Sequence, residues 1–307
     1  MNVTLRKIDA FSWNGSAGNP AAVCYPSADQ VLPPETMQTI ARELRDEVRE
    51  VGFFFPIGHP QYDAAALGVA AGARQPLYRC KYYSAEREVD FCGHATIAAM
   101  HDLARSGAVR DGEPFSILTN RGALDVYPRA EADAVFIRAP EPRFRNAAIP
   151  RDDTAWALGL DPAALDPSLP LSIVNAGLDT LLVPVSGLDA VLSLAPDFEV
   201  LKDWCFASGA DIVEVFTRET VDHAASWRVR VFPPRMGYLE DPATGSGNSA
   251  LGYYLLRNGL WDGTPLVLEQ NGERNLANRV RLETLPGGQV VLFGGSGVLI
   301  NEIEYRK

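Results

Sequence analysis

The chain has 307 residues, 47% of them hydrophobic, which suits two domains or one large one with a full core. Its formal net charge is -11 at pH 7, and such an acidic surface repels phosphate backbones, so we expect no nucleic-acid partner. A small anionic metabolite is compatible with this charge, because a local site can be positive within an acidic protein.

The first half of the chain predicts two helices among several strands that are apolar or alternate in polarity. The first helix covers residues 33–48, where apolar residues recur at three- and four-residue spacing with charge on the other face. The second helix, rich in alanine, covers residues 96–105 and stops at Gly107. The predicted strands are residues 3–11, 21–25, 51–55, 77–84 and 88–91.

The second half of the chain also predicts two helices among several strands. It follows a Pro- and Ala-rich stretch, residues 145–166, which we interpret as the join between the halves. Helices are predicted at residues 196–204 and 249–257. The predicted strands are residues 172–174, 180–185, 211–217, 226–232, 265–269, 279–283 and 290–293. Because strands outnumber helices and rarely alternate with them one to one, the pattern favours an antiparallel α+β fold over a doubly wound parallel sheet.

The four cysteines and four histidines show no metal-binding pattern. The cysteines lack CxxC spacing and the histidines form no HExxH or HxH set, so we expect neither a disulfide framework nor a zinc site. The first seven residues contain no apolar signal core, and no run of about 18 apolar residues occurs. We therefore expect a cytoplasmic protein without a membrane span.

Residues 92–107 and 244–259 match without a gap at a constant offset of 152. Gly93 matches Gly245 and Gly107 matches Gly259, so the glycines bracket the same element in both segments: a tight turn, a helix and a stop. Any two turn–helix units can share glycines at their ends. We prefer to interpret the match as a duplication that gives two domains related by a pseudo-twofold axis, with a cleft between them.

Both repeats place a glycine turn directly before a helix. A helix N-terminus offers free backbone N–H groups and the positive end of a dipole, and glycine at positions 93 and 245 lets the backbone approach a ligand closely. Two such helix ends that face one cleft would bind carboxylate or enolate oxygens without a metal.

Four polar side chains beside these turns are candidates for acid–base chemistry. His94 follows the first glycine, Ser246 has the matching position in the second repeat, and Asp241 precedes the second turn. Glu50 lies between a charged helix and an apolar strand, where partial desolvation would raise the pKa of its carboxyl toward the range useful for proton transfer. Three of these residues also have a purely structural interpretation. Glu50 could be the last charge of a solvated helix, His94 a core histidine, and Asp241 a helix cap.

Three motifs extend these observations along the chain. Residues 9–11 are Asp-Ala-Phe and residues 18–23 are Gly-Asn-Pro-Ala-Ala-Val. Tyr-Tyr-Ser at 82–84 is followed by Glu-Val-Asp-Phe-Cys-Gly-His-Ala-Thr at 88–96, and Glu-Asp-Pro-Ala-Thr-Gly-Ser occupies 240–246. Together, and in this order, they resemble the signatures of the PhzF-type phenazine biosynthesis family.

The resemblance implies the diaminopimelate epimerase-like α+β fold, in which two pseudo-symmetric domains each wrap a curved, mostly antiparallel sheet around a central helix. It places the N-terminal domain at residues 1–125, with residues 297–307 rejoining it, and the C-terminal domain at residues 126–296. It also implies a homodimer.

The resemblance further implies a cofactor-independent isomerase. The family's best-understood activity is isomerisation of trans-2,3-dihydro-3-hydroxyanthranilate, in which a glutamate moves a proton from one ring carbon to another. In this chain that glutamate is Glu50. The other matching catalytic positions are His94, Asp241 and Ser246, and the implied substrate-binding positions are Gly93, Gly245, Asn19, Tyr83 and Ala95.

The chain also departs from the family pattern around the proposed base. The segment before Glu50 is slightly longer than usual, which makes Glu47 a rival, and Arg49 stands in place of the usual serine. Two alternatives stay open. One is a racemase or dehydratase with Cys92 as its single base, since the matching position holds Thr244 rather than a second cysteine. The other is a non-catalytic small-molecule binding protein that retains an enzyme fold.

Overall fold

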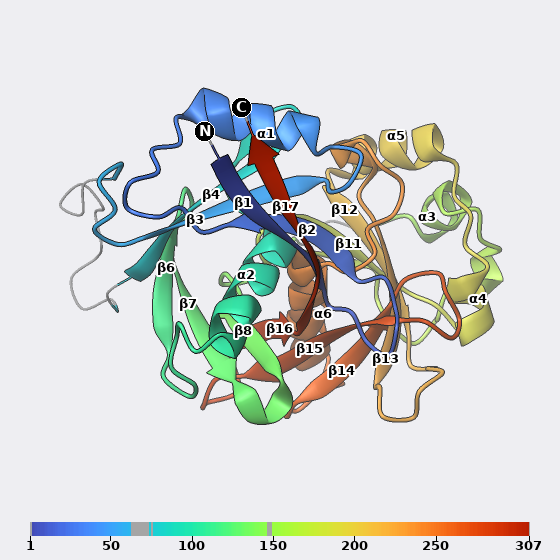
Figure 1. Cartoon of the computed structure of the whole chain (residues 1–307). Helices are drawn as coiled ribbons and strands as arrows, with labels where there is room; N and C mark the ends of the chain where they lie inside the picture. Colours follow the sequence, from blue (N-terminus) through green and yellow to red (C-terminus); the bar gives the residue numbers. More distant parts are fainter. Residues whose placement is uncertain (1, 63–73, 75, 146–148, 307) are drawn as a thin grey trace. The chain divides into compact units, whose positions relative to one another are not determined.

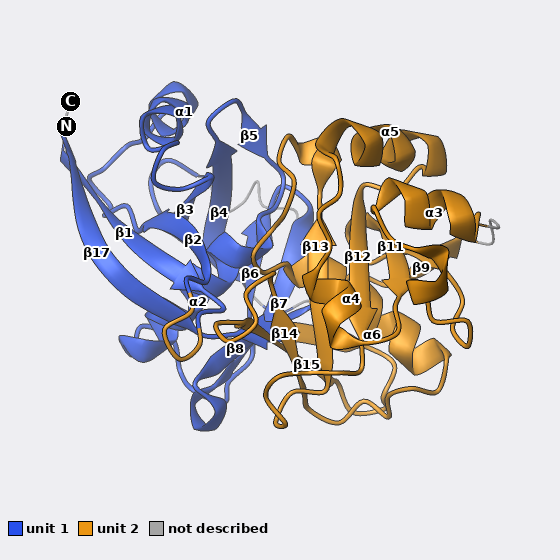
Figure 2. Cartoon of the chain, turned by 90° about the vertical axis from the view of Figure 1, so that its right-hand side faces the viewer, with its two compact units in different colours: residues 1–12, 17–138, 294–307 blue, residues 13–16, 139–293 orange. Residues whose placement is uncertain are grey.

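A computed structural model describes residues 2–62, 74, 76–145 and 149–306 (Figure 1). The chain divides into two compact units, shown in blue and orange in Figure 2. Unit 1 comprises Met1–Ser12, Ala17–Arg138 and Gly294–Lys307, and unit 2 comprises Trp13–Ser16 and Ala139–Phe293. Among the described residues, no helix combines the length and the hydropathy that a membrane span needs.

Unit 1 contains a mixed sheet. Its strands are β1 (Asn2–Ala10), β2 (Asn19–Cys24), β3 (Glu50–Pro56), β4 (Pro76–Ser84), β5 (Glu88–Val89), β6 (Phe115–Thr119), β7 (Gly122–Arg129), β8 (Ala134–Arg138) and β17 (Gly297–Arg306). The strands pair in the order β17–β1–β2–β3–β4–β6–β7–β8, and β5 pairs with β4. Only the β2–β3 and β4–β6 pairs in this series are parallel. The predicted boundary after residue 125 falls inside β7, and antiparallel pairing with β6 and β8 keeps β7 in unit 1.

The helices of unit 1 are α1 (Pro34–Glu43), α2 (Gly93–Arg105) and the 3₁₀ turn η2 (Ala130–Ala132). Strands β1, β2, β3, β7, β8 and β17 all contact α2, so the sheet curves around this helix (Figure 1). Helix α1 is shorter than the predicted 33–48, because the backbone N–H of Leu44 closes the helix on Ile40 and turns follow as far as Val48. The chain therefore enters β3 at Glu50 rather than after it.

The two faces of β3 pack against different helices. Val51, Phe53 and Phe55 belong to a core cluster that also holds the apolar face of α1. Phe54 instead packs edge-on against Tyr82, whose hydroxyl lies 2.7 Å from the hydroxyl of Thr96 in α2. Because side chains alternate along a strand, Glu50 shares the α2 face with Phe54.

Unit 2 has a second mixed sheet. Its strands are β9 (Arg143–Arg145), β10 (Ser172–Asn175), β11 (Asp179–Pro184), β12 (Ile212–Thr217), β13 (Trp227–Phe232), β14 (Leu266–Gln270), β15 (Asn278–Thr284) and β16 (Val291–Gly295), whose last two residues fall in unit 1. Its helices are α3 (Arg151–Ala157), η3 (Pro162–Ala164), α4 (Leu188–Leu192), α5 (Phe198–Ser208), η4 (Pro234–Met236) and α6 (Gly245–Arg257). The stretch interpreted as a join, residues 145–166, contains α3 and η3 and supplies part of this unit's core.

The two sheets repeat the same order of strand senses. In unit 1 the pairs from β1 to β7 are antiparallel, parallel, antiparallel, parallel and antiparallel. In unit 2 the pairs from β10 to β15 follow the same sequence. Helix α2 precedes β6, and helix α6 precedes the corresponding β14. This agreement supports the duplication inferred from the gap-free match of residues 92–107 with 244–259.

Candidate active site

Glu50, Cys92 and His94 form a compact cluster in unit 1, which we call the Glu50 cluster. Nε2 of His94 lies 3.4 Å from Oε2 of Glu50, and Nδ1 of the same ring lies 3.5 Å from Sγ of Cys92. The carboxylate, thiol and imidazole atoms of these residues all lie within 4.8 Å of one another. The fold thus places a carboxylate, a thiol and an imidazole close enough to interact with one another.

The first turn of α2 fixes two members of the Glu50 cluster. Cys92 is the N-cap residue of this helix, with extended backbone angles, and His94 is the second helical residue. Thr96 anchors this turn, because its hydroxyl donates to the carbonyl of Cys92 at 2.7 Å and also contacts the hydroxyl of Tyr82 in β4. The beginning of α2 is therefore tied to the sheet that carries Glu50.

Burial keeps the imidazole of His94 neutral. Desolvation, and then the positive charge of Arg49, lower the pKa of His94 from 6.5 to about 3. At neutral pH, a proton on Nε2 would point toward Glu50 and leave Nδ1 as an acceptor for the thiol of Cys92. The Glu50 side chain is 18% exposed, so its carboxylate keeps access to a ligand while no imidazolium neutralises it.

The N-terminal turn of α2 adds a binding element for anions. The side chain of the N-cap residue Cys92 does not cap the backbone N–H groups of the first turn, and this turn carries no acidic residue. The N–H groups of Gly93, His94 and Ala95 therefore belong to an uncapped helix N-terminus, which favours oxyanions. Gly93 and Ala95, which are predicted to bind substrate, and His94, which is predicted to be catalytic, lie in one helical turn.

Two residues that are predicted to bind substrate, Asn19 and Tyr83, lie on opposite faces of the unit 1 sheet. Asn19 begins β2, and strand alternation places it on the α2 face, as it does Glu50. Tyr83 pairs with Val51 on the opposite face, where its ring meets Phe53 and its hydroxyl donates to Glu88 at 3.3 Å. The structure therefore does not bring Tyr83 to the cluster.

Glu47, the rival for the role of base, also lies outside the Glu50 cluster. Its carboxylate is half exposed and pairs with Nζ of Lys7 at 3.5 Å. It belongs to the turn that links α1 to β3 rather than to the strand itself. The geometry favours Glu50 over Glu47 as the base.

Unit 2 contains the corresponding turn at the start of α6. Its N-cap residue, Thr244, has φ -127 and ψ 112, nearly the angles of Cys92. The Thr244 hydroxyl donates to Oδ2 of the buried Asp241 at 2.5 Å. Gly245 must lack a side chain, because a Cβ there would lie 2.3 Å from the ring of Phe293. Ser246 follows in the first turn, at the position that His94 has in α2.

Sequence reasoning missed Gln270, which holds this turn in place. The fully buried amide of Gln270 donates to the carbonyl of Asp241 and to the hydroxyl of Thr244, at 2.9 and 3.0 Å. Its oxygen accepts from the backbone N–H of Thr244 at 3.0 Å and from the Asn248 side chain at 2.7 Å. A polar residue at the end of an apolar strand was the available signal.

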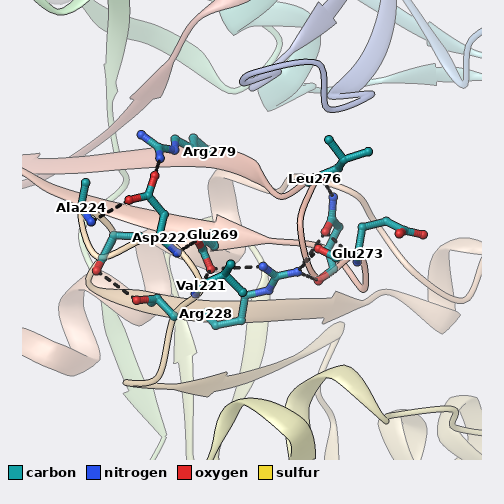
Figure 3. A network of polar contacts seen from close by, with 11 residues as sticks. Val221, Asp222, Ala224, Arg228, Glu269, Glu273, Leu276 and Arg279 are labelled. Atoms are coloured by element: carbon teal, nitrogen blue, oxygen red, sulfur yellow. Dashed lines mark hydrogen bonds and ion pairs between the residues drawn. The ribbon is translucent and has the colours of Figure 1, made fainter.

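A buried ion pair holds the strands beside Gln270 (Figure 3). Arg228 of β13 lies directly opposite Glu269 of β14 and donates to its carboxylate at 3.2 Å. The same carboxylate accepts from the backbone N–H groups of Val221 and Asp222, at 3.0 and 2.7 Å. Since Gln270 follows Glu269 in β14, this network helps to fix the position of the Gln270 amide.

Glu214 is a second residue that sequence reasoning missed. Its side chain is fully buried in β12, and neither carboxyl oxygen has a hydrogen-bond partner among the described residues. Burial raises the pKa of Glu214 well above its ordinary value, which favours the neutral carboxyl in the folded protein. Oε2 packs closely against Gly247 of α6, where a Cβ would lie only 2.5 Å away.

Comparison with known proteins identifies a family. The sequence profile of the family described as phenazine biosynthesis-like protein (PhzC-PhzF) matches residues 8–299. An uncharacterized isomerase of Pseudomonas aeruginosa is 30% identical over 97% of this chain and 97% of its own length. A protein of Pseudomonas fluorescens named trans-2,3-dihydro-3-hydroxyanthranilate isomerase is 28% identical over 87% of this chain and 84% of its own length.

Solved structures agree on the fold. A PhzF-family protein of Bacillus anthracis is 25% identical, with a TM-score of 0.79 and full coverage of both chains. A hydroxyproline epimerase from Agrobacterium vitis matches with a TM-score of 0.56 at 12% identity, over 99% of this chain and 92% of its own. These likenesses confirm the predicted epimerase-like α+β fold.

Proposed function

Because this chain belongs to the phenazine biosynthesis-like protein family of isomerases, we propose that Glu50 moves a proton between two carbons of a small carboxylate-bearing substrate. The observation that carries the proposal is the position of the Glu50 carboxylate beside the His94 imidazole. The Glu50 side chain is 18% exposed at the start of β3, and its carboxylate lies 3.4 Å from the His94 imidazole, which is 11% exposed and stays neutral. A carboxylate beside a neutral hydrogen-bond donor is suited to abstracting a proton and returning it.

The proposed reaction conserves every atom of the substrate. Glu50 takes a proton from one carbon, the electron pair of that C–H bond delocalises toward an electron-withdrawing group, and the same carboxyl returns the proton to another carbon. No oxidant or leaving group is required. The N–H groups at the start of α2 would stabilise the developing negative charge, and the His94 imidazole would orient the carboxylate or a substrate oxygen.

The proposed substrate class is a dihydrohydroxyanthranilate-like acid, following the name of the Pseudomonas fluorescens relative. Asp241 and Ser246 are assigned to the catalytic set and Gly245 to substrate binding from the C-terminal motif. The buried, anchored Asp241 carboxylate supports this assignment. The cleft between the two halves stays a prediction from the sequence, as do a homodimer, a cytoplasmic location and independence from metals and cofactors.

Replacing the proposed base tests this function. In Glu50→Gln we expect turnover to fall by about 10²- to 10⁴-fold, the usual contribution of a general base, with an unchanged circular dichroism spectrum. Turnover is measured by NMR on candidate dihydroaromatic acids in heavy water, where a true substrate gains deuterium only with active enzyme. Glu47→Gln is the matched control and should remain active. A Glu50→Gln protein that exchanges deuterium at the wild-type rate would reject the assignment.

A second candidate function uses Cys92 as the base of a racemase or dehydratase. Its support is the 3.5 Å separation between Sγ of Cys92 and Nδ1 of His94, which would let the imidazole receive the thiol proton. This alternative predicts that Cys92→Ala abolishes turnover while Glu50→Gln retains it. The opposite ranking of the two variants favours the glutamate mechanism.

A further inference from the structure

We propose that Glu50, Cys92 and His94 form a binding site for a thiophilic divalent cation, with Zn²⁺ as the best-fitting ion, and that this cation inhibits the enzyme. The binding follows from the geometry of the Glu50 cluster alone. The inhibition rests on the proposed function, because it requires Glu50 to be the base.

The three side chains offer a ligand set that suits zinc. A carboxylate oxygen, a thiol sulfur and an imidazole nitrogen lie within 4.8 Å of one another. Nε2 of His94 is 3.4 Å from Oε2 of Glu50 and 3.8 Å from Sγ of Cys92. Neighbouring ligand atoms around a tetrahedral zinc ion are roughly 3.3–3.6 Å apart, so the two separations that involve His94 need to change by only a few tenths of an ångström.

The chemistry of the ligands selects against the common hard cations. Mg²⁺ and Ca²⁺ require mostly oxygen ligands, whereas this cluster supplies one oxygen with one nitrogen and one sulfur. Soft and borderline ions such as Zn²⁺ prefer thiolate and imidazole. Three protein ligands would leave one position for water or for a substrate oxygen. Binding would release the thiol proton of Cys92, so affinity should fall as the pH falls.

The ligands are also held in place before a cation arrives. Two of them belong to the first turn of α2, which Thr96 ties to the carbonyl of Cys92 and to β4. Glu50 is the first residue of a strand that pairs on both sides. Little conformational entropy would therefore be lost on binding.

Two features oppose a cation and limit its affinity. The positive charge of Arg49 acts on the His94 ring, and the N-terminal end of α2 carries the positive end of the helix dipole. The site is consequently expected to bind zinc reversibly. Replacing Arg49 by serine should tighten binding, which is the opposite of the effect expected from removing a ligand.

A bound cation would inhibit by occupying the base. A Glu50 carboxylate that coordinates zinc cannot accept a proton from carbon, and the ion would neutralise the charge that makes it basic. Zinc should therefore compete with substrate, and a chelator should restore full turnover.

Cobalt(II) titration of the full-length, chelator-treated protein tests the site directly. We expect one cobalt ion per chain, with a near-ultraviolet thiolate-to-cobalt absorption band, and competitive displacement of cobalt by Zn²⁺. Cys92→Ser should abolish the band and weaken zinc binding by about tenfold or more. Cys80→Ala, which removes another buried cysteine of unit 1, is the matched control and should retain both.

Zinc binding measured by calorimetry separates this inference from the proposed function. If the cobalt band depends on Cys92 but turnover does not need Glu50, the proposed metal site is supported and the proposed mechanism of inhibition is rejected. Loss of turnover in Glu50→Gln together with absent or Cys92-independent zinc binding would overturn the site. If Cys92→Ser fails to fold, His94→Gln and Glu50→Gln provide the same test, because each should weaken zinc binding by about tenfold or more.

Discussion

His94 shows how burial decides the charge of a single residue at the candidate site. Its pKa is lowered from 6.5 to about 3 in the folded protein, whereas the unfolded chain keeps the ordinary value. As the pH falls below 6.5, only the unfolded chain takes up this proton, so stability is lost as the pH decreases toward about 3.

We therefore expect His94→Gln to flatten the acid side of the stability profile. Wild type should lose up to about 1.4 kcal/mol per pH unit through this residue, and the variant should lack that contribution. Urea unfolding at a series of pH values below neutrality measures the slope, and the exposed His223→Gln serves as control. Equal slopes for wild type and His94→Gln would contradict the neutral, buried imidazole.

Glu214 predicts the opposite pH dependence. Burial raises its pKa in the folded protein above the ordinary value of 4.5, so the folded state keeps a proton that the unfolded chain releases. Stability is then lost as the pH rises above 4.5. The free energy of unfolding of Glu214→Gln, relative to wild type, should increase by about 1.4 kcal/mol per pH unit in that range. The exposed Glu199→Gln should show no such trend, and a constant difference for Glu214→Gln would reject a neutral carboxyl.

At the scale of residues, the candidate residues that lie in sequence motifs could be named from the sequence. Residues whose properties depend on burial in the folded protein could not. Glu50 and His94 follow from the motifs and meet in the structure. Tyr83, which was predicted to bind substrate, lies on the opposite face of its strand from Tyr82, because a one-residue difference along a strand changes the face, and Tyr82 contacts α2. Nothing in the local sequence around Glu214 shows that its strand is buried on both faces.

At the scale of elements, the first turns of helices α2 and α6 carry candidate site residues. Helices α2 and α6 begin at Gly93 and Gly245, three and four residues before the predicted starts at 96 and 249. Glycines typical of turns concealed these first turns from the pattern of apolar residues. As a result, His94 and Ser246 belong to helical turns rather than to preceding loops. The strands that were predicted were located more closely, because their apolar runs are continuous, but β6, β7, β8 and β9 were not predicted.

The start of α6 should depend on the amide of Gln270. Replacing it by leucine leaves the N–H of Thr244, the amide of Asn248 and the carbonyl of Asp241 without their partner. We expect Gln270→Leu to reduce the free energy of unfolding by about 2–4 kcal/mol, as measured by urea denaturation. Gln289→Leu, at an exposed position, should change it by less than about 0.5 kcal/mol. A Gln270→Leu protein as stable as wild type would show that the amide is not needed to hold this turn.

At the scale of the whole chain, the duplication could be predicted but the unit boundaries could not. The gap-free match of residues 92–107 with 244–259 covers only the two central helices and the residues beside them. The β7–β8 hairpin was not predicted from the sequence. The predicted boundary therefore falls within β7, whereas unit 1 continues to Arg138. Long-range strand pairing, rather than local pattern, determines where each unit ends.

The pairing of the two chain ends offers a test at this scale. Strand β17 pairs with the whole of β1, from Asn2 opposite Arg306 to Ala10 opposite Gly297, and Tyr305 completes the core that α1 covers. Ending the chain after Ser296 would leave β1 as an open edge with unpaired backbone groups. We expect hydrogen exchange of β1 amides to accelerate strongly, while the β11–β12 pair of unit 2 keeps its protection, since unit 2 has its own core. A chain ending at Tyr305 should behave as wild type, and unchanged protection of β1 in the shorter chain would mean that β17 is dispensable for unit 1.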